Sequence, residues 1–211
     1  MADAGFQASL LGWGPDIDVG SLAGSVARQQ LTRGAWIDVR RGWVRGADAL
    51  FERLRDCVPW QAERRAMYER MVAVPRLVAF FDEGESLPDP ALDVAKRELD
   101  AHYAAELGER FATAGLCLYR DGRDSVAWHG DRIGRGNSAD TMVAILVLGA
   151  PRSLLLRPLG GGGPAARYVL GHGDLIVMGG SCQRTWEHAI PKTARPVGPR
   201  ISVQFRPRDV R

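Results

Sequence analysis

Two histidines and one aspartate stand at spacings from which a metal site can be built. His129 and Asp131 form an H-x-D pair in the predicted strand SVAWHGD, where positions i and i+2 project from the same face. His188 lies in a second predicted strand, TWEHAI, which an antiparallel barrel can bring alongside. Two imidazoles and one carboxylate make the facial triad of non-haem Fe(II) oxygenases, which leaves coordination positions open. A structural histidine with a solvated aspartate at a turn is the alternative interpretation.

A second set of polar groups shares one face of the last predicted strand, RISVQFR. The alternation puts Ile201, Val203 and Phe205 on the opposite, apolar face. On an edge strand the polar face would simply be solvated. At a barrel mouth near His188 it would form a clamp for a dicarboxylate such as 2-oxoglutarate, because a guanidinium can grip a carboxylate bidentately. The residues of this face are Arg200, Ser202, Gln204 and Arg206.

The second half of the chain reads as a series of short strands that could position these groups. From residue 115 onward, short apolar runs follow one another, separated by glycine, proline or charged turns. Eight such runs in so short a stretch predict an antiparallel sandwich or barrel. The runs are GLCLYR, SVAWHGD, TMVAILVLG, SLLLRP, ARYVL, DLIVMGG, RTWEHAI and RISVQFRP.

The first half of the chain predicts helices and loops. Residues 47–57 place apolar side chains at helical spacing before Pro59, and residues 90–111 form the clearest helix, with a proline at its start. Residues 61–81 are ambiguous, because QAERRAMYERM favours helix by propensity whereas VPRLVAFF favours a strand. Residues 1–45 are predicted to be loop-rich, with one possible strand at Trp36–Arg40.

Composition narrows the class of protein. Hydrophobic residues make up 45% and charged residues 25%, as in ordinary soluble domains, and no apolar run approaches the ~20 residues that span a bilayer. The N-terminus lacks an early basic cluster, so we expect a cytoplasmic protein without a membrane partner. The net charge is +3, with 26 arginines and 2 lysines. Arginine suits phosphate and carboxylate partners, although surface or codon bias would give the same count.

The ordered set of motifs resembles the AlkB-type Fe(II)/2-oxoglutarate dioxygenases, which repair alkylated nucleic acids. The matching stretches together cover roughly residues 60–207. They are VPRLVAFFDEG (74–84), LYRDGRDSVAWHGD (118–131), SLLLRPLGGG (153–162), GDLIVMGGSCQRTWEHAIPKT (173–193) and RISVQFRP (200–207).

The resemblance implies a fold, a cofactor set and a reaction. The fold is mainly β with flanking helices (α+β), a double-stranded β-helix or jelly roll. His129, Asp131 and His188 are implied to bind Fe(II) and carry catalysis, with 2-oxoglutarate and O2 as co-substrates. Tyr119 and Arg200 are implied to contact 2-oxoglutarate, with Arg206 beside them, and Ser202 and Gln204 can hydrogen-bond to its carboxylate. The implied reaction is oxidative demethylation of alkylated DNA or RNA bases, releasing formaldehyde, succinate and CO2. We expect an alkylated nucleic acid as partner, with DNA favoured over RNA, and a monomeric enzyme.

Several positions depart from the family pattern. Cys117 stands where the family often has asparagine, and Arg132 with Ile133 stands where repair enzymes usually carry an acidic residue that reads the damaged base. Arg76 and Phe80 are further candidates for substrate contact beside Arg132, although core packing is the simpler explanation for Phe80. These departures keep two alternatives open: the same chemistry on a protein or small molecule, and a non-catalytic jelly-roll binding module.

The expected organisation is a single dioxygenase domain over residues 1–211. It divides into a loop-rich N-terminal extension (1–45), a helical and substrate-lid region (46–114) and a jelly-roll catalytic core (115–207).

Overall fold

The computed structural model describes residues 17–67, 70–161 and 166–211, without the side chains of residues 64–73. The first sixteen residues of the predicted N-terminal extension therefore lie outside the described part. The helices are α1 (Ala47–Cys57), α2 (Pro90–Leu107) and the short α3 (Cys182–Thr185). The strands are β1 (Asp18–Val19), β2 (Ala27–Gln30), β3 (Ala35–Arg40), β4 (Val44–Arg45), β5 (Gln61–Met67), β6 (Arg70–Phe81), β7 (Thr113–Tyr119), β8 (Val126–His129), β9 (Val143–Gly149), β10 (Arg152–Pro158), β11 (Ala166–Leu170), β12 (Asp174–Gly180), β13 (Trp186–Ile190) and β14 (Arg200–Arg206).

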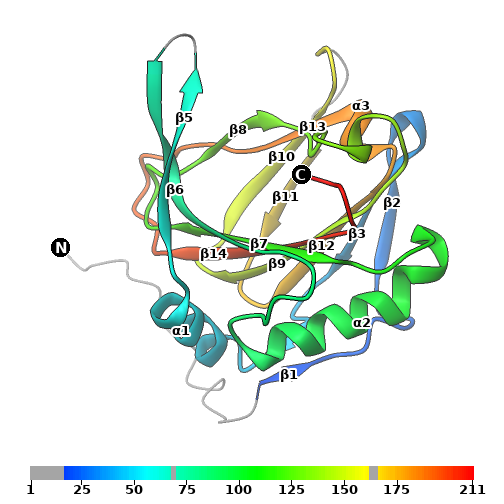
Figure 1. Ribbon diagram of the computed structural model, residues 1–211, viewed down its shortest axis with the longest axis horizontal. Helices are drawn as coiled ribbons and strands as arrows, with labels where there is room; N and C mark the ends of the chain where they lie inside the picture. Colours follow the sequence, from blue (N-terminus) through cyan, green and yellow to red (C-terminus); the bar gives the residue numbers. More distant parts are fainter. Residues whose placement is uncertain (1–16, 68–69, 162–165) are drawn as a thin grey trace.

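Two antiparallel sheets form the body of the protein (Figure 1). The larger sheet has the order β2-β3-β12-β9-β14-β7-β6-β5, and the smaller has the order β11-β10-β13-β8. From β7 to β14 the chain passes back and forth between the two sheets, with β10 and β11 paired as neighbours in the smaller sheet, which is the connectivity of a double-stranded β-helix. All eight strands predicted from residue 115 onward are present, and the predicted jelly roll is confirmed.

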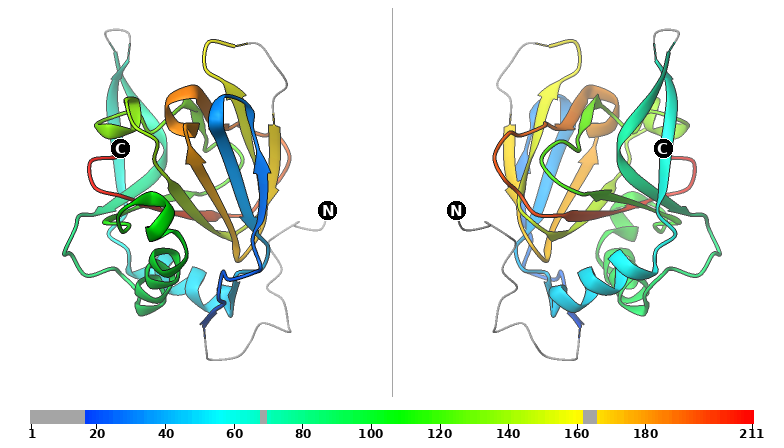
Figure 2. Two further views of the ribbon diagram at one scale, coloured as in Figure 1. Left: turned by 90° about the vertical axis from the view of Figure 1, so that its right-hand side faces the viewer. Right: turned by 90° about the vertical axis from the view of Figure 1, so that its left-hand side faces the viewer.

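The centre of the larger sheet is buried on both faces, which explains the continuous apolar runs of strands such as β9. In β9, Ala144, Leu146 and Leu148 belong to a core cluster shared with the two long helices. Val143, Ile145 and Val147 belong to a second cluster shared with the smaller sheet. A strand covered on both sides loses the polar–apolar alternation of a half-exposed strand. Figure 2 shows the two helices lying together on one side of the strands.

The two predicted long helices are confirmed, each with a recognisable boundary. Helix α1 spans the predicted 47–57, and the extended backbone of Val58 ends it before Pro59. In α2, the Asp89 carboxylate accepts a hydrogen bond from the Ala91 N–H at 2.9 Å and caps the first turn. That helix ends at Leu107, four residues before the prediction, because Gly108 adopts a left-handed conformation with φ 79°.

The ambiguous stretch 61–81 forms an antiparallel hairpin, β5–β6, and not a helix. The second half of β6 pairs with β7, with Phe80 opposite Gly115, so the hairpin extends the larger sheet. The outer ends of β5 and β6 extend away from the other strands of the larger sheet (Figure 1). Strand pairing therefore overrides the helical propensity of QAERRAM.

The described part of the N-terminal extension is more ordered than the predicted loop. The predicted strand at 36–40 is confirmed as β3, which pairs with β12 inside the larger sheet. Strand β2, which was not predicted, pairs with the other side of β3 and forms the sheet edge. All four residues of β2 are exposed, so no apolar period marks them in the sequence. Among the described residues, no helix combines the length and apolarity needed to cross a membrane.

Candidate metal and co-substrate site

The two histidines predicted to bind metal face each other across neighbouring strands of the smaller sheet. His129 is the last residue of β8 and pairs with His188 of β13. Their ring centroids lie 4.2 Å apart. The Asp131 carboxylate joins them, and the potential ligand atoms of the three residues all lie within 4.8 Å of one another. The structure thus brings together the three residues that the sequence analysis selected.

Asp131 reaches this position from a loop and not from the strand itself. Strand β8 ends at His129, so the predicted i, i+2 strand geometry does not hold. Instead, the Asp131 N–H donates to Oε1 of Gln183 at 2.9 Å, and that amide is buried. Gly130 allows the tight approach, because a Cβ there would lie 2.4 Å from the Gln183 carbonyl oxygen. Gln183 was missed in the sequence because nothing marks a glutamine of α3 as a neighbour of Asp131.

The hydrogen bonds of the triad leave metal-binding atoms free. His129 Nδ1 lies 2.9 Å from the Ala127 carbonyl and 3.2 Å from the His188 carbonyl. A proton on Nδ1 that is shared with these carbonyls leaves Nε2 as the free lone pair, and His129 Nε2 lies 3.7 Å from Asp131 Oδ1. The second carboxylate oxygen, Oδ2, accepts from Arg206 Nε at 2.7 Å.

Electrostatics hold His188 and Asp131 in the protonation states that a divalent metal requires. Burial lowers the pKa of His188 to about 3, and the neighbouring His129 contributes to the same direction. Burial alone would raise the pKa of Asp131, but the charges of Arg206 and of the two histidines outweigh it and hold that pKa well below its usual range. At neutral pH the site therefore offers a neutral imidazole and a carboxylate, the forms that coordinate metals.

The polar face of β14 points into the same cavity as the triad. Arg200, Ser202, Gln204 and Arg206 all line it, as predicted, together with Tyr119 from β7. Gln204 Nε2 donates to Ser202 Oγ at 2.5 Å, which fixes both side chains. Cys117, at the position where asparagine was expected, places its Sγ 3.8 Å from Gln204 Oε1.

The environment of Arg200 indicates which kind of ligand this cavity can bind. Its side chain is 1% exposed, and its Nε and Nη1 atoms have no hydrogen-bond partner among the described residues. Its Cζ lies 5.2 Å from the centroid of the Tyr119 ring. A buried guanidinium with two unused donors is costly unless an anion enters. A carboxylate fits these donors, so the residues present fit a metal ion at one end of the cavity and a 2-oxo dicarboxylate reaching Arg200.

Arg206 lines the cavity and contacts the triad directly. Its Nε is paired with the Asp131 carboxylate. It is the last residue of β14, at the opposite end of the strand from Arg200. The expected place of Arg206 beside the co-substrate stays a prediction.

The three predicted substrate residues lie at different depths. Arg76 lines the cavity and donates to the Ser125 carbonyl at 3.2 Å. Phe80 is 56% exposed, so the simpler prediction of core packing is wrong for this residue. A Cβ on Gly115 would lie 3.1 Å from Phe80 Cε1 and 2.8 Å from Arg206 Nη1, which places the exposed ring beside the cavity residues. Arg132 lies 3.7 Å from Glu187, outside the cavity.

Comparisons with known proteins agree with this geometry. The model of the 2OG-Fe(II) oxygenase superfamily matches residues 61–206. The human "Alpha-ketoglutarate-dependent dioxygenase alkB homolog 3" is 29% identical over 181 residues, which cover 77% of this chain and 62% of that protein. The "DNA oxidative demethylase ALKBH2" of Arabidopsis thaliana is 32% identical over 133 residues, covering 53% of this chain and 42% of that protein. The chain thus matches less than two thirds of the length of these relatives.

Solved structures show the same fold. The structure of OsALKBH1 superimposes with a TM-score of 0.60 at 12% identity, covering 86% of this chain and 100% of that one. A prolyl-4-hydroxylase from Pseudomonas putida superimposes with a TM-score of 0.52 at 17% identity, covering 82% of this chain and 92% of that one. Fold, triad and family match together show that this chain belongs to the 2OG-Fe(II) oxygenase superfamily, and within it the chain is similar to AlkB homologues.

Proposed function

We propose that this dioxygenase oxidatively demethylates alkylated bases in nucleic acid, with DNA as the favoured substrate. The observation that carries the proposal is that the His129–Asp131–His188 triad and the unpartnered Arg200 donors line one and the same cavity. The names of the AlkB relatives, one of them a DNA oxidative demethylase, support the choice of substrate.

Each residue of the cavity has an assigned role in this proposal. His129, Asp131 and His188 hold Fe(II), and Arg206 keeps the Asp131 carboxylate oriented and ionised. Arg200 binds the distal carboxylate of 2-oxoglutarate, and Tyr119, Ser202 and Gln204 complete that end of the cavity. When bound, iron supplies the activation of O2 that the side chains of the protein cannot provide.

The overall reaction balances without any further reactant. An N-methyl base, 2-oxoglutarate and O2 give the unmethylated base, formaldehyde, succinate and CO2. One oxygen atom enters succinate and the other enters formaldehyde, while the C1–C2 bond of 2-oxoglutarate breaks. The protein must bind, orient and shield the reacting groups from water.

The target base must leave its stack to reach the buried triad. Phe80 offers an exposed aromatic face at the cavity edge on which a base can stack. Arg76 lies deeper and can donate to the base or to a phosphate. Arg132 is half-buried and paired with Glu187. We therefore assign it to contact with the part of the nucleic-acid strand that stays outside the pocket.

Turnover of methylated oligonucleotides tests the proposal. Succinate and formaldehyde should form in equal amounts with single-stranded DNA that carries one N-methylated base, and neither should rise above background with the unmethylated strand. His188→Ala should abolish both products. If no methylated DNA or RNA strand raises succinate formation above the uncoupled background, the substrate assignment is wrong.

A second candidate keeps the chemistry and changes the substrate to a protein side chain or small molecule. It is favoured by Arg132 and the exposed Ile133, which stand where an acidic base-reading residue was expected. Peptides and small metabolites that raise succinate formation in competition with oligonucleotides would support it. The further alternative, a non-catalytic binding module, requires that the protein fail to bind iron.

A further inference from the structure

Arg152 is a buried arginine that pairs with no carboxylate in the described part of the chain. It is the first residue of β10, and only 5% of its surface is exposed. Nη1 donates to the Asp121 carbonyl at 3.1 Å, and Nη2 donates to the carbonyls of Asp124 and Pro191 at 3.0 and 2.6 Å. Among the described residues, its hydrogen bonds thus go to neutral main-chain oxygens and it forms no ion pair.

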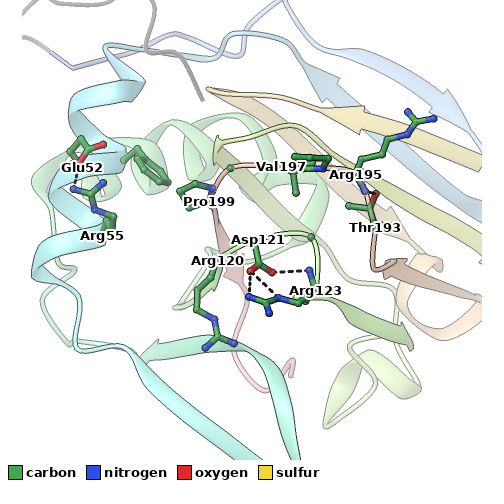
Figure 3. A pocket seen from close by; sticks show the side chains of 14 residues that line it. Glu52, Arg55, Arg120, Asp121, Arg123, Thr193, Arg195, Val197 and Pro199 are labelled. Atoms are coloured by element: carbon green, nitrogen blue, oxygen red, sulfur yellow. Dashed lines mark hydrogen bonds and ion pairs between the residues drawn. The ribbon is translucent and has the colours of Figure 1, made fainter. Parts of the chain in front are cut away.

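Asp121 and Asp124, whose main-chain carbonyls accept from Arg152, have side chains already engaged by other arginines. The Asp121 side chain pairs with Arg123 at 2.7 Å, and the Asp124 side chain pairs with Arg120 at 2.8 Å. Figure 3 shows the Asp121–Arg123 pair on the wall of an open hollow between α1 and the 193–199 segment. The carboxylates of the 121–124 turn therefore bind the surface residues Arg120 and Arg123, whereas its carbonyl oxygens accept from the buried Arg152.

Arg152 lies close to the proposed co-substrate arginine. Arg200 pairs with Gly149, three residues before Arg152, and the Ala150 N–H donates to the Pro199 carbonyl at 2.9 Å. Burial lowers the pKa of Arg200, and the positive charge of Arg152 lowers it further, while Tyr119 opposes the shift. Burial likewise lowers the pKa of Arg152.

Two like charges buried near each other are unfavourable until an anion joins them. Arg200 keeps two donors free for that anion, whereas the donors of Arg152 are held by carbonyl oxygens. A singly charged ligand group at Arg200 would offset one of the two cations, so the second positive charge near it strengthens the attraction for that carboxylate.

We infer that Arg152 is a positioning residue that acts through Arg200 to make the cavity select a 2-oxo acid with a second, distal carboxylate. The inference rests on the assignment of Arg200 to co-substrate binding in the proposed function. It differs from a purely structural role, in which Arg152 would only clamp the 121–124 turn to Pro191.

Binding of two 2-oxo acids separates these roles. The Mn(II)-loaded protein is titrated without O2 by calorimetry with 2-oxoglutarate and with 2-oxopentanoate, which has the same chain length but one carboxylate. The dissociation constant of 2-oxopentanoate divided by that of 2-oxoglutarate measures selectivity for the distal carboxylate. Arg152→Met should lower this ratio about tenfold through weaker 2-oxoglutarate binding, with 2-oxopentanoate binding unchanged.

A charge-retaining variant and a matched surface variant complete the experiment. Arg152→Lys should keep the ratio within about threefold of wild type even where it lowers the melting temperature, because the charge remains. Arg167→Met removes an exposed arginine from the adjacent strand β11 and should leave the ratio unchanged. If Arg152→Met does not fold, Arg152→Gln retains amide donors for the carbonyls and carries the same expectation.

Equal weakening of both acids in the neutral variants, or no change in either, would overturn the inference and leave Arg152 as a loop clamp. The titration contains no nucleic acid. A protein that selects 2-oxoglutarate through Arg152 but demethylates no oligonucleotide would therefore refute only the proposed substrate.

Discussion

At the scale of single residues, the site consists of side chains whose chemistry is visible in the sequence and side chains whose role depends only on the fold. The triad and the polar face of β14 were predictable, because the ordered set of motifs around them resembles one family, although the H-x-D pair alone is a weak signal. Gln183 and Arg152 were not predictable, since an ordinary glutamine and arginine acquire their roles from neighbours far away in the chain.

Gln183 provides a test of how the loop after β8 is held. Gln183→Leu removes the acceptor for the Asp131 N–H, leaving that donor unsatisfied in a buried site. We expect metal affinity to fall about 10- to 100-fold, the usual effect of losing a group that orients a ligand. Competition with a fluorescent chelator for Mn(II) measures it. Arg184→Ala, which removes the exposed neighbour paired with Asp140, should bind metal as wild type does; equal affinity in the two variants would contradict the role of Gln183.

Phe80 provides a test of substrate contact at the cavity edge. Phe80→Ala should change the free energy of unfolding by no more than about 0.5 kcal/mol, because the ring is exposed. It should raise the KM for a methylated oligonucleotide roughly five- to hundredfold, the loss expected for one base-stacking contact. Succinate formation over a range of oligonucleotide concentrations provides the measurement. The neighbouring Phe81 packs against the core, so Phe81→Ala should instead lower stability.

At the scale of elements, the sequence pattern predicted a helix or strand correctly where one face of that element is apolar. It did not do so where hydrogen bonding to a neighbouring strand decides the structure. Helix α1 was bounded correctly, because Leu50, Phe51 and Leu54 mark its buried stripe. Strand β5 looked helical because its residues have high helix propensity, and only its register with β6 makes it a strand. Exposed β2 has no pattern at all and is defined by its hydrogen bonds to β3.

The N-terminal cap of α2 gives a prediction in which stability falls but binding at the cavity does not change. Asp89 is buried, caps the Ala91 N–H and pairs with Arg53 at 3.0 Å. Asp89→Ala should lower the free energy of unfolding by roughly 1–2 kcal/mol. Urea denaturation measures this loss, with the exposed Asp93→Ala in the same first turn as the matched control. Because α2 packs on the side of the larger sheet that faces away from the cavity, 2-oxoglutarate affinity should not change.

At the scale of the whole molecule, two separate hydrophobic core clusters hold the layers of the fold together. One cluster joins the helices to the larger sheet, and the other joins the two sheets around the cavity. The second cluster encloses the buried charges of Arg200 and Asp131, which are tolerated because the cavity is arranged to receive ligands of opposite charge.

Ligand binding should therefore stabilise the whole protein. With Mn(II) bound, 2-oxoglutarate at 100 times its dissociation constant should add about 2.7 kcal/mol to the free energy of unfolding. Thermal unfolding without O2 measures the shift, and removal of the metal by a chelator should abolish most of it. A melting temperature that does not respond to 2-oxoglutarate in the metal-loaded protein would contradict the role of Arg200.

The most direct test of the central claim is the absorbance of the protein with Fe(II) and 2-oxoglutarate under anaerobic conditions. Bidentate binding of the 2-oxo acid to iron produces a metal-to-ligand charge-transfer band. We expect that band in the wild-type protein, its loss in His129→Ala, and its appearance in Arg200→Ala only at much higher 2-oxoglutarate concentrations. A wild-type protein that shows no band would contradict the assignment of the triad and of Arg200 to one dioxygenase site.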